Sequence, residues 1–275
     1  MNFRYPECLR LAAVTLGLGL LISSAGGADT TPAPLSAKDL AAGLSALQDG
    51  ASYVRLRLEV KQPPDTTKIT LQLQIKERHT KTATDLVYQI LWPKEHKGEA
   101  VLLQKTEGNA PTGTLFLPPD KPRTLNTSQM KEALFGSDLS YQDVIENFFG
   151  WENQTIVGTE SLNRVSCSIL ESRPGKGDFS NYASIRSWID PRRLVPLRVE
   201  KYRASGQLAL RIDTTRVAAD DKGRPIPADL TVSGSRADSV TNLDGSRIRH
   251  DVTFTDREFT PEGLAEGLAP PSASE

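Results

Sequence analysis

Two neighbouring stretches in which apolar and polar residues alternate constrain this chain most. Over residues 54–60 valine and leucine stand at every second position, and over residues 69–75 isoleucine and leucine do the same. Alternation with a period of two places one kind of side chain on each face of a strand. The turn residues Pro63, Pro64 and Asp65 separate the two stretches, so we predict two half-buried strands that pair antiparallel.

Nine further segments are predicted as strands and are mostly separated by proline and glycine signals. They are residues 86–92, 100–104, 114–117, 123–126, 155–157, 165–170, 182–189, 195–202 and 208–217. Residues 230–233 and 248–254 are predicted as two late strands. Strongly twisted open sheets rarely exceed about ten strands without curling. The sequence therefore predicts a mainly β fold with few helices, whose antiparallel sheet of about eleven long strands curls.

The predicted helices are few and short. Ser36 followed by Asp39 resembles a capping box and predicts a helix that ends near residue 47. In the middle of the chain, a first short helix is expected to stop at Gly136. A second helix is expected to begin at Ser140, which forms a capping box with Asp143.

This second central helix carries a strongly apolar face for so short an element. The face is formed by Tyr141, Val144, Ile145 and Phe148. Such a face must be buried, and the concave side of the curled sheet is the natural place for it. Two arrangements follow from this: either the concave side is filled solid, or the helices cover a cavity.

The beginning of the chain has the layout of a secretory signal peptide. Basic residues precede an apolar run over residues 11–22, and small residues follow it. The run falls short of the roughly 20 apolar residues that a membrane-spanning helix needs. We expect residues 1–28 to be the signal peptide region, with cleavage after Ala25 or Ala28. Cys8 precedes the apolar run, so we expect export without lipid attachment.

The remaining chain is predicted to form one domain. Residues 29–259 contain no repeat and no change in composition that would mark a boundary. From residue 260 to residue 275, Pro, Ala, Gly, Ser and Glu dominate. This composition predicts a flexible tail.

The charges and histidines give little reason to expect nucleic acid, metal or cofactor. Basic and acidic residues number 33 and 34, for a formal net charge of -1, so no polyanionic partner is indicated. None of His79, His96 and His250 stands at metal-ligand spacing from another histidine or from a cysteine. We therefore expect no metal site and no cofactor.

One short motif resembles a catalytic one. Ser128 and Lys131 form an S-x-x-K pattern, which in serine acyl enzymes lets a lysine activate the serine one turn away. The S-D-N and K-T-G partner motifs of those enzymes are missing. A helix cap at Thr127 or Ser128 with a solvated lysine is the better interpretation, and we expect no enzymatic activity.

Asp138, in the loop between the two central helices, has two interpretations. It can pin this loop against the sheet, or it can cap the second helix or stabilise a turn. The second interpretation is the more common role of an aspartate in such a loop. The sequence does not decide between them.

Several segments resemble one known family. Residues 135–143 read Phe-Gly-Ser-Asp-Leu-Ser-Tyr-Gln-Asp, which resembles the G-S-D-[F/L]-S-Y-x-D segment of outer-membrane lipoprotein-sorting (LolA-like) proteins. Residues 97–103 followed by 113–118 are similar to the glycine turn of that family and its strand ending in proline. Residues 187–191 followed by 194–199 are similar to its W-[IV]-D hairpin.

The resemblance implies an incomplete β-barrel around an apolar cavity, with helices as a lid, in a periplasmic protein. The sorting chaperone of that family holds the acyl chains of lipoproteins. The residues expected to contact lipid are Val54, Leu56, Leu58, Leu71 and Leu73 on the strands and Tyr141, Val144, Ile145 and Phe148 on the lid. The motif loop consists of Gly136, Ser137 and Asp138.

The leading hypothesis is a periplasmic carrier of lipids or lipoprotein acyl chains that works without a cofactor. Its partner would be a lipid or a lipidated protein, with an envelope transport complex as a further candidate. The alternative is a non-enzymatic accessory module of an envelope transport complex, with a packed core and exposed strand edges. A cavity that binds lipid favours the first hypothesis.

Overall fold

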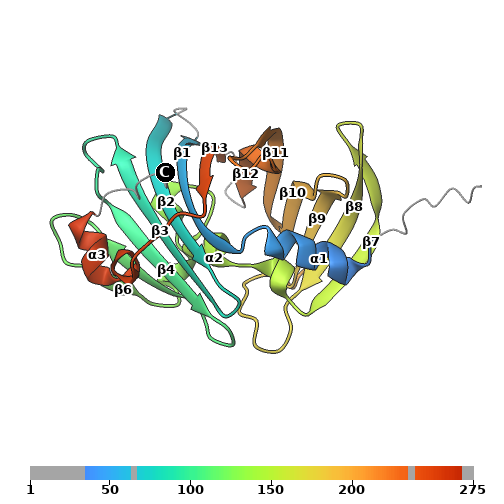
Figure 1. The fold of residues 1–275 in the computed structure, drawn as a ribbon, viewed down its shortest axis with the longest axis horizontal. Helices are drawn as coiled ribbons and strands as arrows, with labels where there is room; N and C mark the ends of the chain where they lie inside the picture. The colour runs from blue at the N-terminus through green and yellow to red at the C-terminus, as the bar shows by residue number, and fades with distance from the viewer. Residues whose placement is uncertain (1–34, 63–66, 235–238, 268–275) are drawn as a thin grey trace, which may run out of the picture. The chain divides into compact units, whose positions relative to one another are not determined.

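The computed structural model describes residues 35–62, 67–234 and 239–267 of the 275-residue chain. The predicted signal peptide lies outside these residues. Within them the chain forms a 13-stranded sheet in which every pairing is antiparallel (Figure 1). In chain order the strands are β1 (Gly50–Gln62), β2 (Thr67–His79), β3 (Ala83–Trp92), β4 (Ala100–Thr106), β5 (Thr112–Phe116), β6 (Arg123–Leu125), β7 (Asn153–Leu162), β8 (Val165–Arg173), β9 (Ser184–Asp190), β10 (Val195–Tyr202), β11 (Leu208–Ala219), β12 (Pro225–Gly234) and β13 (Val240–His250).

Two meanders make up this sheet, and the last strand joins them. The strand order is β6-β5-β4-β3-β2-β1-β13-β12-β11-β10-β9-β8-β7. Strand β13 pairs with β1, with Val54 opposite Ile248, so the end of the chain completes the sheet beside its beginning. Strands β6 and β7 form the two edges of the described sheet and do not pair with each other. The predicted mainly β, unclosed antiparallel fold is confirmed.

The predicted strand count and the position of the last strand need correction. Both late strands belong to the sheet, so it has 13 strands rather than about eleven. The last strand is β13, which lies at residues 240–250, whereas the sequence predicted residues 248–254. A register shift between Arg55 and Arg57 interrupts the pairing of β1 with β13. Such an irregularity breaks the period-two alternation, which explains why β13 was placed too late.

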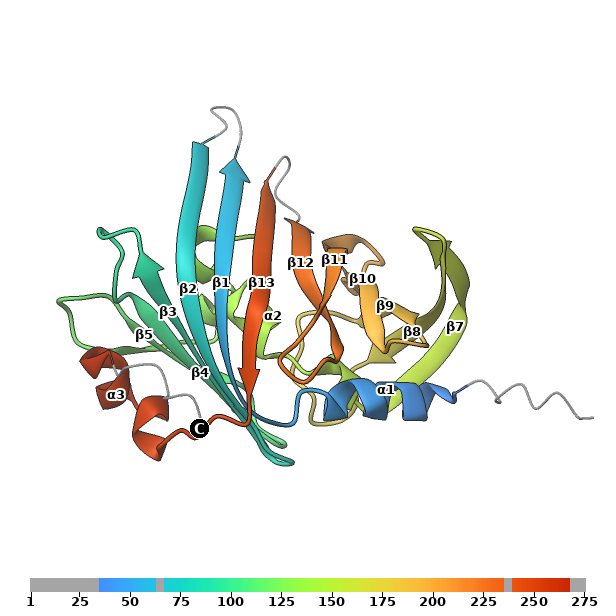
Figure 2. The ribbon, with the colours of Figure 1, turned by 45° about the horizontal axis from the view of Figure 1, so that its top comes forward.

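Helix α1 (Ala37–Ala46) forms as predicted. The Ser36 side chain accepts a hydrogen bond from the backbone N–H of Asp39 at 3.2 Å, which satisfies one of the free donors at the helix start. Leu40, Ala41 and Leu44 are buried on one side of the helix. Helix α1 lies beside β7 (Figures 1 and 2) and packs on Phe149, on Leu170 of β8 and on Ile189 of β9.

The central segment, defined here as residues 127–151, differs from the predicted helical pair. Its elements are η1 (Gln129–Lys131), η2 (Leu134–Gly136), α2 (Tyr141–Ile145) and η3 (Phe148–Gly150), where η marks a 3-10 turn. The first predicted helix is therefore two short turns, because Glu132 and Ala133 between them are extended. Gly136, with a φ of 77°, ends the second turn. The Ser140–Asp143 capping box of α2 is confirmed. Helix α2 stops at Ile145, since Glu146 is extended.

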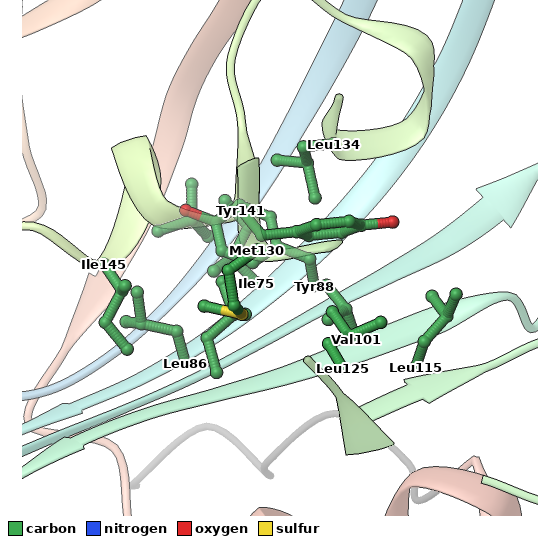
Figure 3. Packing of buried hydrophobic residues seen from close by; sticks show 12 residues of the cluster. Ile75, Leu86, Tyr88, Val101, Leu115, Leu125, Met130, Leu134, Tyr141 and Ile145 are labelled. Carbon is green, nitrogen blue, oxygen red and sulfur yellow. The ribbon is translucent and has the colours of Figure 1, made fainter. Parts of the chain in front are cut away.

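The central segment packs on one face of the sheet, which we call the inner face. Figure 3 shows Met130, Leu134 and Tyr141 of the segment lying over side chains of β2 to β6, including Tyr88 and Val101. Alternation sends Val87 and Leu102 to the opposite, outer face. The inner face of this half of the sheet is thus largely filled by the central segment.

The predicted flexible tail begins too early. Residues 261–266 form helix α3 (Pro261–Glu266), which follows the turn η4 (Asp256–Phe259). Thr260 caps the helix, Pro261 occupies its first turn, and Gly267 ends it in the left-handed conformation. Leu264 is buried with Phe259 against the outer face of β3 and β4. Thr260, Pro261 and Gly267 belong to the segment whose composition predicted a tail, but in the structure they mark the two ends of a helix.

None of the described helices has the length and apolar character needed to cross a bilayer.

Candidate ligand-binding cavity

A cavity of about 460 Å³ opens between α1, the central segment and the ends of several strands. Its volume falls in the range of roughly 300–1,000 Å³ that small-molecule sites occupy. Most of its wall is apolar. Helix α1 contributes Leu44, the central segment contributes Val144, Ile145 and Phe149, and the sheet contributes residues such as Leu230 and Ile248.

Polar groups gather on one rim of the cavity. Ser52 of β1 lies in register with Glu77 of β2 on one side and with His250 of β13 on the other. All three residues line the cavity, together with His79. The Ser52 hydroxyl donates a hydrogen bond to Oε2 of Glu77 at 2.7 Å. Neighbouring strands therefore present a polar row next to the apolar wall.

His250 also belongs to the group of described residues best placed to hold a cation. The ligand atoms of Asp220, Asp221 and His250 all lie within 4.8 Å of one another. These atoms already have partners: Nδ1 of His250 lies 2.5 Å from Oδ1 of Asp221, and Arg224 donates to Asp220 at 2.9 Å. Asp220 also accepts the backbone N–H groups of Lys222 and Arg224. This arrangement stabilises the turn between β11 and β12.

A buried ionic cluster lies beside the cavity, on the inner face of β10. The ammonium group of Lys201 contacts Oδ1 of Asp143 at 2.8 Å and Oε2 of Glu146 at 3.1 Å. The Tyr182 hydroxyl donates to the same Asp143 oxygen at 2.9 Å. The side chains of the three charged residues are only 1–4% exposed. Lys201 thus ties the middle of α2 and the residue that follows it to the sheet.

Electrostatics hold Lys201 and Asp143 of this cluster in their charged forms. Burial disfavours the charge on Lys201, but the carboxylates of Asp143 and Glu146 outweigh it and raise the pKa of Lys201 above its usual value. Burial also opposes ionisation of Asp143, yet the charge and hydrogen bond of Lys201 lower the pKa of that carboxyl. Burial, followed by the neighbouring Asp143, raises the pKa of Tyr182, so this phenol stays protonated and donates.

The sequence interpretation missed Lys201 and Glu146, although one signal pointed to the lysine. In β10, Val199 packs on the inner face with Trp151 and Ile185, and Lys201 is the next position on that face. A lysine that continues an apolar face requires a buried counter-charge. Its partner Asp143 was recognised for its role in the capping box, not as a counter-ion.

Asp138 pins the loop between η2 and α2 to the sheet. Its Oδ2 accepts hydrogen bonds from the hydroxyls of Ser239 at 3.1 Å and Thr241 at 2.7 Å. Its backbone N–H donates to the Thr241 hydroxyl at 2.9 Å. Ser140, not Asp138, caps α2. The interpretation of Asp138 as a cap for this helix is therefore wrong, and the loop-pinning alternative is the observed one.

The other two residues of the motif loop shape its backbone. Gly136 has a φ of 77°, a conformation that residues with a Cβ rarely adopt. Ser137 is fully buried, accepts a hydrogen bond from the N–H of Leu139 and donates to its carbonyl. The loop is thus held by its own hydrogen bonds and by Asp138.

The structure does not bring the nine predicted lipid-contacting residues into one site. Val144 and Ile145 line the cavity, whereas the other seven do not. Leu58, Leu71 and Leu73 form a tightly packed cluster, which Leu56 and Phe135 join. Because Phe135 packs against these strand residues, they are core rather than cavity wall.

The remaining three predicted residues are also packed. Val54 and Tyr141 belong to the cluster between the central segment and the sheet. Phe148 stacks at a tilt on Phe149, with ring centroids 4.4 Å apart, and meets Trp151 edge-on. It belongs to η3, because α2 ends three residues earlier, so it does not share the cavity-facing side of α2.

The S-x-x-K pattern carries no site geometry. Ser128 and Lys131 are both exposed, and the Ser128 side chain makes no capping hydrogen bond in η1. Instead, Asn126 and Gln129 exchange hydrogen bonds between side chain and backbone at 3.0 Å. The predicted cap at Thr127 or Ser128 is therefore replaced by one at Asn126.

Comparison with known proteins places the chain in a family. A family model described as an uncharacterized protein matches residues 83–266, more than half of the chain. No curated protein matches the sequence. A DUF1329 family protein from Desulfovibrio piger is 22% identical with a TM-score of 0.76, and the alignment covers 83% of this chain and 97% of that one.

Two further solved structures carry names related to lipoprotein sorting. A putative outer membrane lipoprotein-sorting protein domain from Vibrio parahaemolyticus is 18% identical with a TM-score of 0.72, covering 83% of this chain and 98% of that one. A LolA superfamily protein from Nitrosomonas europaea is 19% identical with a TM-score of 0.66, covering 82% and 98%. Such identities establish the fold alone. The chain therefore belongs to the family of uncharacterized proteins that the matching model describes, and it has the fold of the LolA superfamily.

Proposed function

We propose that this protein is a periplasmic carrier that binds a lipid, or the acyl chain of a lipidated protein, in the cavity beside α1 and α2. The observation that carries the proposal is the cavity itself, whose wall is mainly apolar and which lies next to an inner face that the central segment largely fills over β2 to β6. Fold neighbours named for lipoprotein sorting support the same class of ligand. The layout of residues 1–28 as a signal peptide supports export.

Apolar contact supplies the affinity in this proposal. Each methylene group transferred from water into the cavity contributes about 0.8 kcal/mol. Lengthening a bound chain by two methylene groups therefore strengthens binding by about 1.6 kcal/mol, roughly 15-fold, until the cavity is full. Binding needs no covalent step, so release requires only that the cavity open or that a partner compete for the chain.

A fluorescent fatty-acyl probe titrated into the mature protein tests the proposal. Ile226, a half-buried residue of β12, lines the cavity, so Ile226→Trp should fill the space and weaken probe binding at least tenfold. Val157→Trp is the matched control, because Val157 lies exposed on β7, outside the cavity. A wild-type protein that binds no probe, or an Ile226→Trp variant that binds as well as the wild type, would overturn the proposal.

A second candidate function rests on the exposed edge of the sheet. Strand β7 is an edge strand, and its Ile156 and Val157 are 37% and 47% exposed. An unpaired edge with exposed apolar residues can accept a strand from a partner. An accessory module of an envelope transport complex would use this edge. If the protein is such a module, Val157→Glu should dissociate it from the complex. The same substitution should leave its binding of the acyl probe unchanged, because Val157 lies outside the cavity.

A further inference from the structure

One buried acceptor in the cavity wall lacks a donor. Glu146 lines the cavity, and its side chain is 1% exposed. Its Oε2 contacts Lys201, but none of the described residues donates a hydrogen bond to its Oε1. A buried carboxylate oxygen without a donor costs roughly 1–3 kcal/mol or more. Because Oε1 itself is almost inaccessible, a ligand in the cavity can supply this donor once the Glu146 side chain turns toward it.

The buried cluster carries an excess of negative charge. Asp143 and Glu146 share the ammonium group of Lys201, so two carboxylates face one cation and the cluster has a formal charge of -1. In a buried site of low effective dielectric, this charge attracts a cation and repels an anion more strongly than it would in water.

The other carboxylates of the cavity wall add negative charge to that of the cluster. Asp49 and Glu77 join Glu146 as acidic residues of the wall. The described residues that line the cavity include no lysine and no arginine, and its other titratable side chains are His79 and His250. A fatty-acid carboxylate or a phosphate headgroup would therefore find no lysine or arginine in this wall.

From this geometry we infer that the cavity selects an alkyl chain that carries an N–H donor, with an ammonium group preferred and a carboxylate disfavoured. The donor binds Oε1 of Glu146, and the chain lies against Val144, Phe149 and Leu230. This inference rests on the proposed function, because it names the class of lipid that the cavity takes. It follows from the charge and hydrogen-bond state of the wall, not from the shape of the fold.

A ranking of ligands with equal chain length tests the inference. Dodecylamine, dodecanol and dodecanoate are titrated below their micelle concentrations against the mature protein, by displacement of a neutral fluorescent alkyl probe. We expect dodecylamine to bind at least tenfold more tightly than dodecanoate, with dodecanol between them. Equal binding of all three, or tighter binding of dodecanoate, overturns the inference and leaves the carrier proposal intact. Binding of none of them overturns both.

A single substitution checks which residue sets the preference. Glu146→Gln keeps the size of the side chain and removes its charge, leaving Lys201 paired with Asp143 alone. We expect the ratio of amine to carboxylate affinity to fall about tenfold, while dodecanol binding changes little. Glu95→Gln is the control, because Glu95 is exposed and lies outside the cavity. An unchanged ratio in a folded Glu146→Gln protein overturns the role of Glu146, and the wild-type ranking stands as an independent test if this variant does not fold.

Discussion

At the scale of single residues, Lys201 determines how the central segment is held. It is the largest side chain among those that are fully buried in the described residues. A buried lysine is tolerated only when paired carboxylates offset the loss of hydration, and Asp143 in α2 and Glu146 directly after it provide them. The aromatic rings of Tyr182 and Phe148 lie 5.0 Å and 5.8 Å from the ammonium nitrogen. The same residue therefore offsets part of the negative charge of the cluster and fixes the helix.

Replacing Lys201 by methionine should destabilise the protein by about 3–5 kcal/mol, because two buried carboxylates lose their counter-ion. Urea unfolding at pH 7 measures this loss, with Lys131→Met, a change at an exposed lysine, as the control that should change little. A loss below about 1 kcal/mol would contradict the account of the cluster.

The pH dependence of this variant should have the opposite sign to that of the wild type. The pKa of Asp143 is lowered from 3.8 in the folded protein, so its contribution to stability is present above about pH 4 and is lost as the pH falls. In Lys201→Met the buried carboxylates favour protonation in the folded state. Its unfolding free energy should therefore be higher at pH 5 than at pH 7. Urea unfolding curves recorded at these two pH values would show the difference. A variant whose stability falls over this interval would contradict the prediction.

Asp138→Ala should cost about 1.5–3 kcal/mol, the usual range for hydrogen bonds to a charged group, because the hydroxyls of Ser239 and Thr241 lose their acceptor. Hydrogen exchange should increase in the loop between η2 and α2 before it increases in the strands. Asp120→Ala, in an exposed turn, is the control. Equal stability of the two variants would show that Asp138 does not pin the loop.

At the scale of elements, the sequence predicted those whose signals are local. The cap of α1 is set by Ser36 and Asp39 within one turn, and β1 and β2 follow from strict alternation, so both were predicted correctly. Strand β13 was misplaced because its pairing with β1 contains a register shift. The ionic cluster was missed because Lys201 lies 55 residues from Glu146 in the sequence. A contact between residues that are far apart in the sequence produces no local pattern from which it could be predicted.

Helix α3 shows the same limit at the end of the described chain. Thr260, Pro261 and Gly267 are helix-boundary residues, yet their composition resembles that of a disordered tail. What fixes the helix is tertiary contact, because Leu264 is 2% exposed and packs with Phe259 on the sheet.

Leu264→Ala should therefore destabilise the protein by about 2–4 kcal/mol, as other buried leucine truncations do. Residues 256–267 should lose hydrogen-exchange protection in this variant. Glu262→Ala, at an exposed position of the same helix, should leave both quantities nearly unchanged. If Leu264→Ala behaves like this control, α3 is not anchored by Leu264.

At the scale of the whole described chain, the pairing of β1 with β13 connects the two meanders. This contact joins strands from opposite ends of the sequence, and the central segment contacts strands on both sides of it. We propose that residues 29–259 fold as one domain for this reason. Thermal unfolding of the mature protein should show one transition, whereas two well-separated transitions would contradict this proposal.

Native mass spectrometry of protein purified from the periplasm tests the central claim most directly, because it detects a ligand that the cavity has selected itself. The account predicts one alkyl-chain molecule bound per protein in the wild type and in Val157→Trp, and little or none in Ile226→Trp, whose indole occupies the cavity. A wild-type protein that carries no lipid, or an Ile226→Trp variant that carries as much lipid as the wild type, would contradict it.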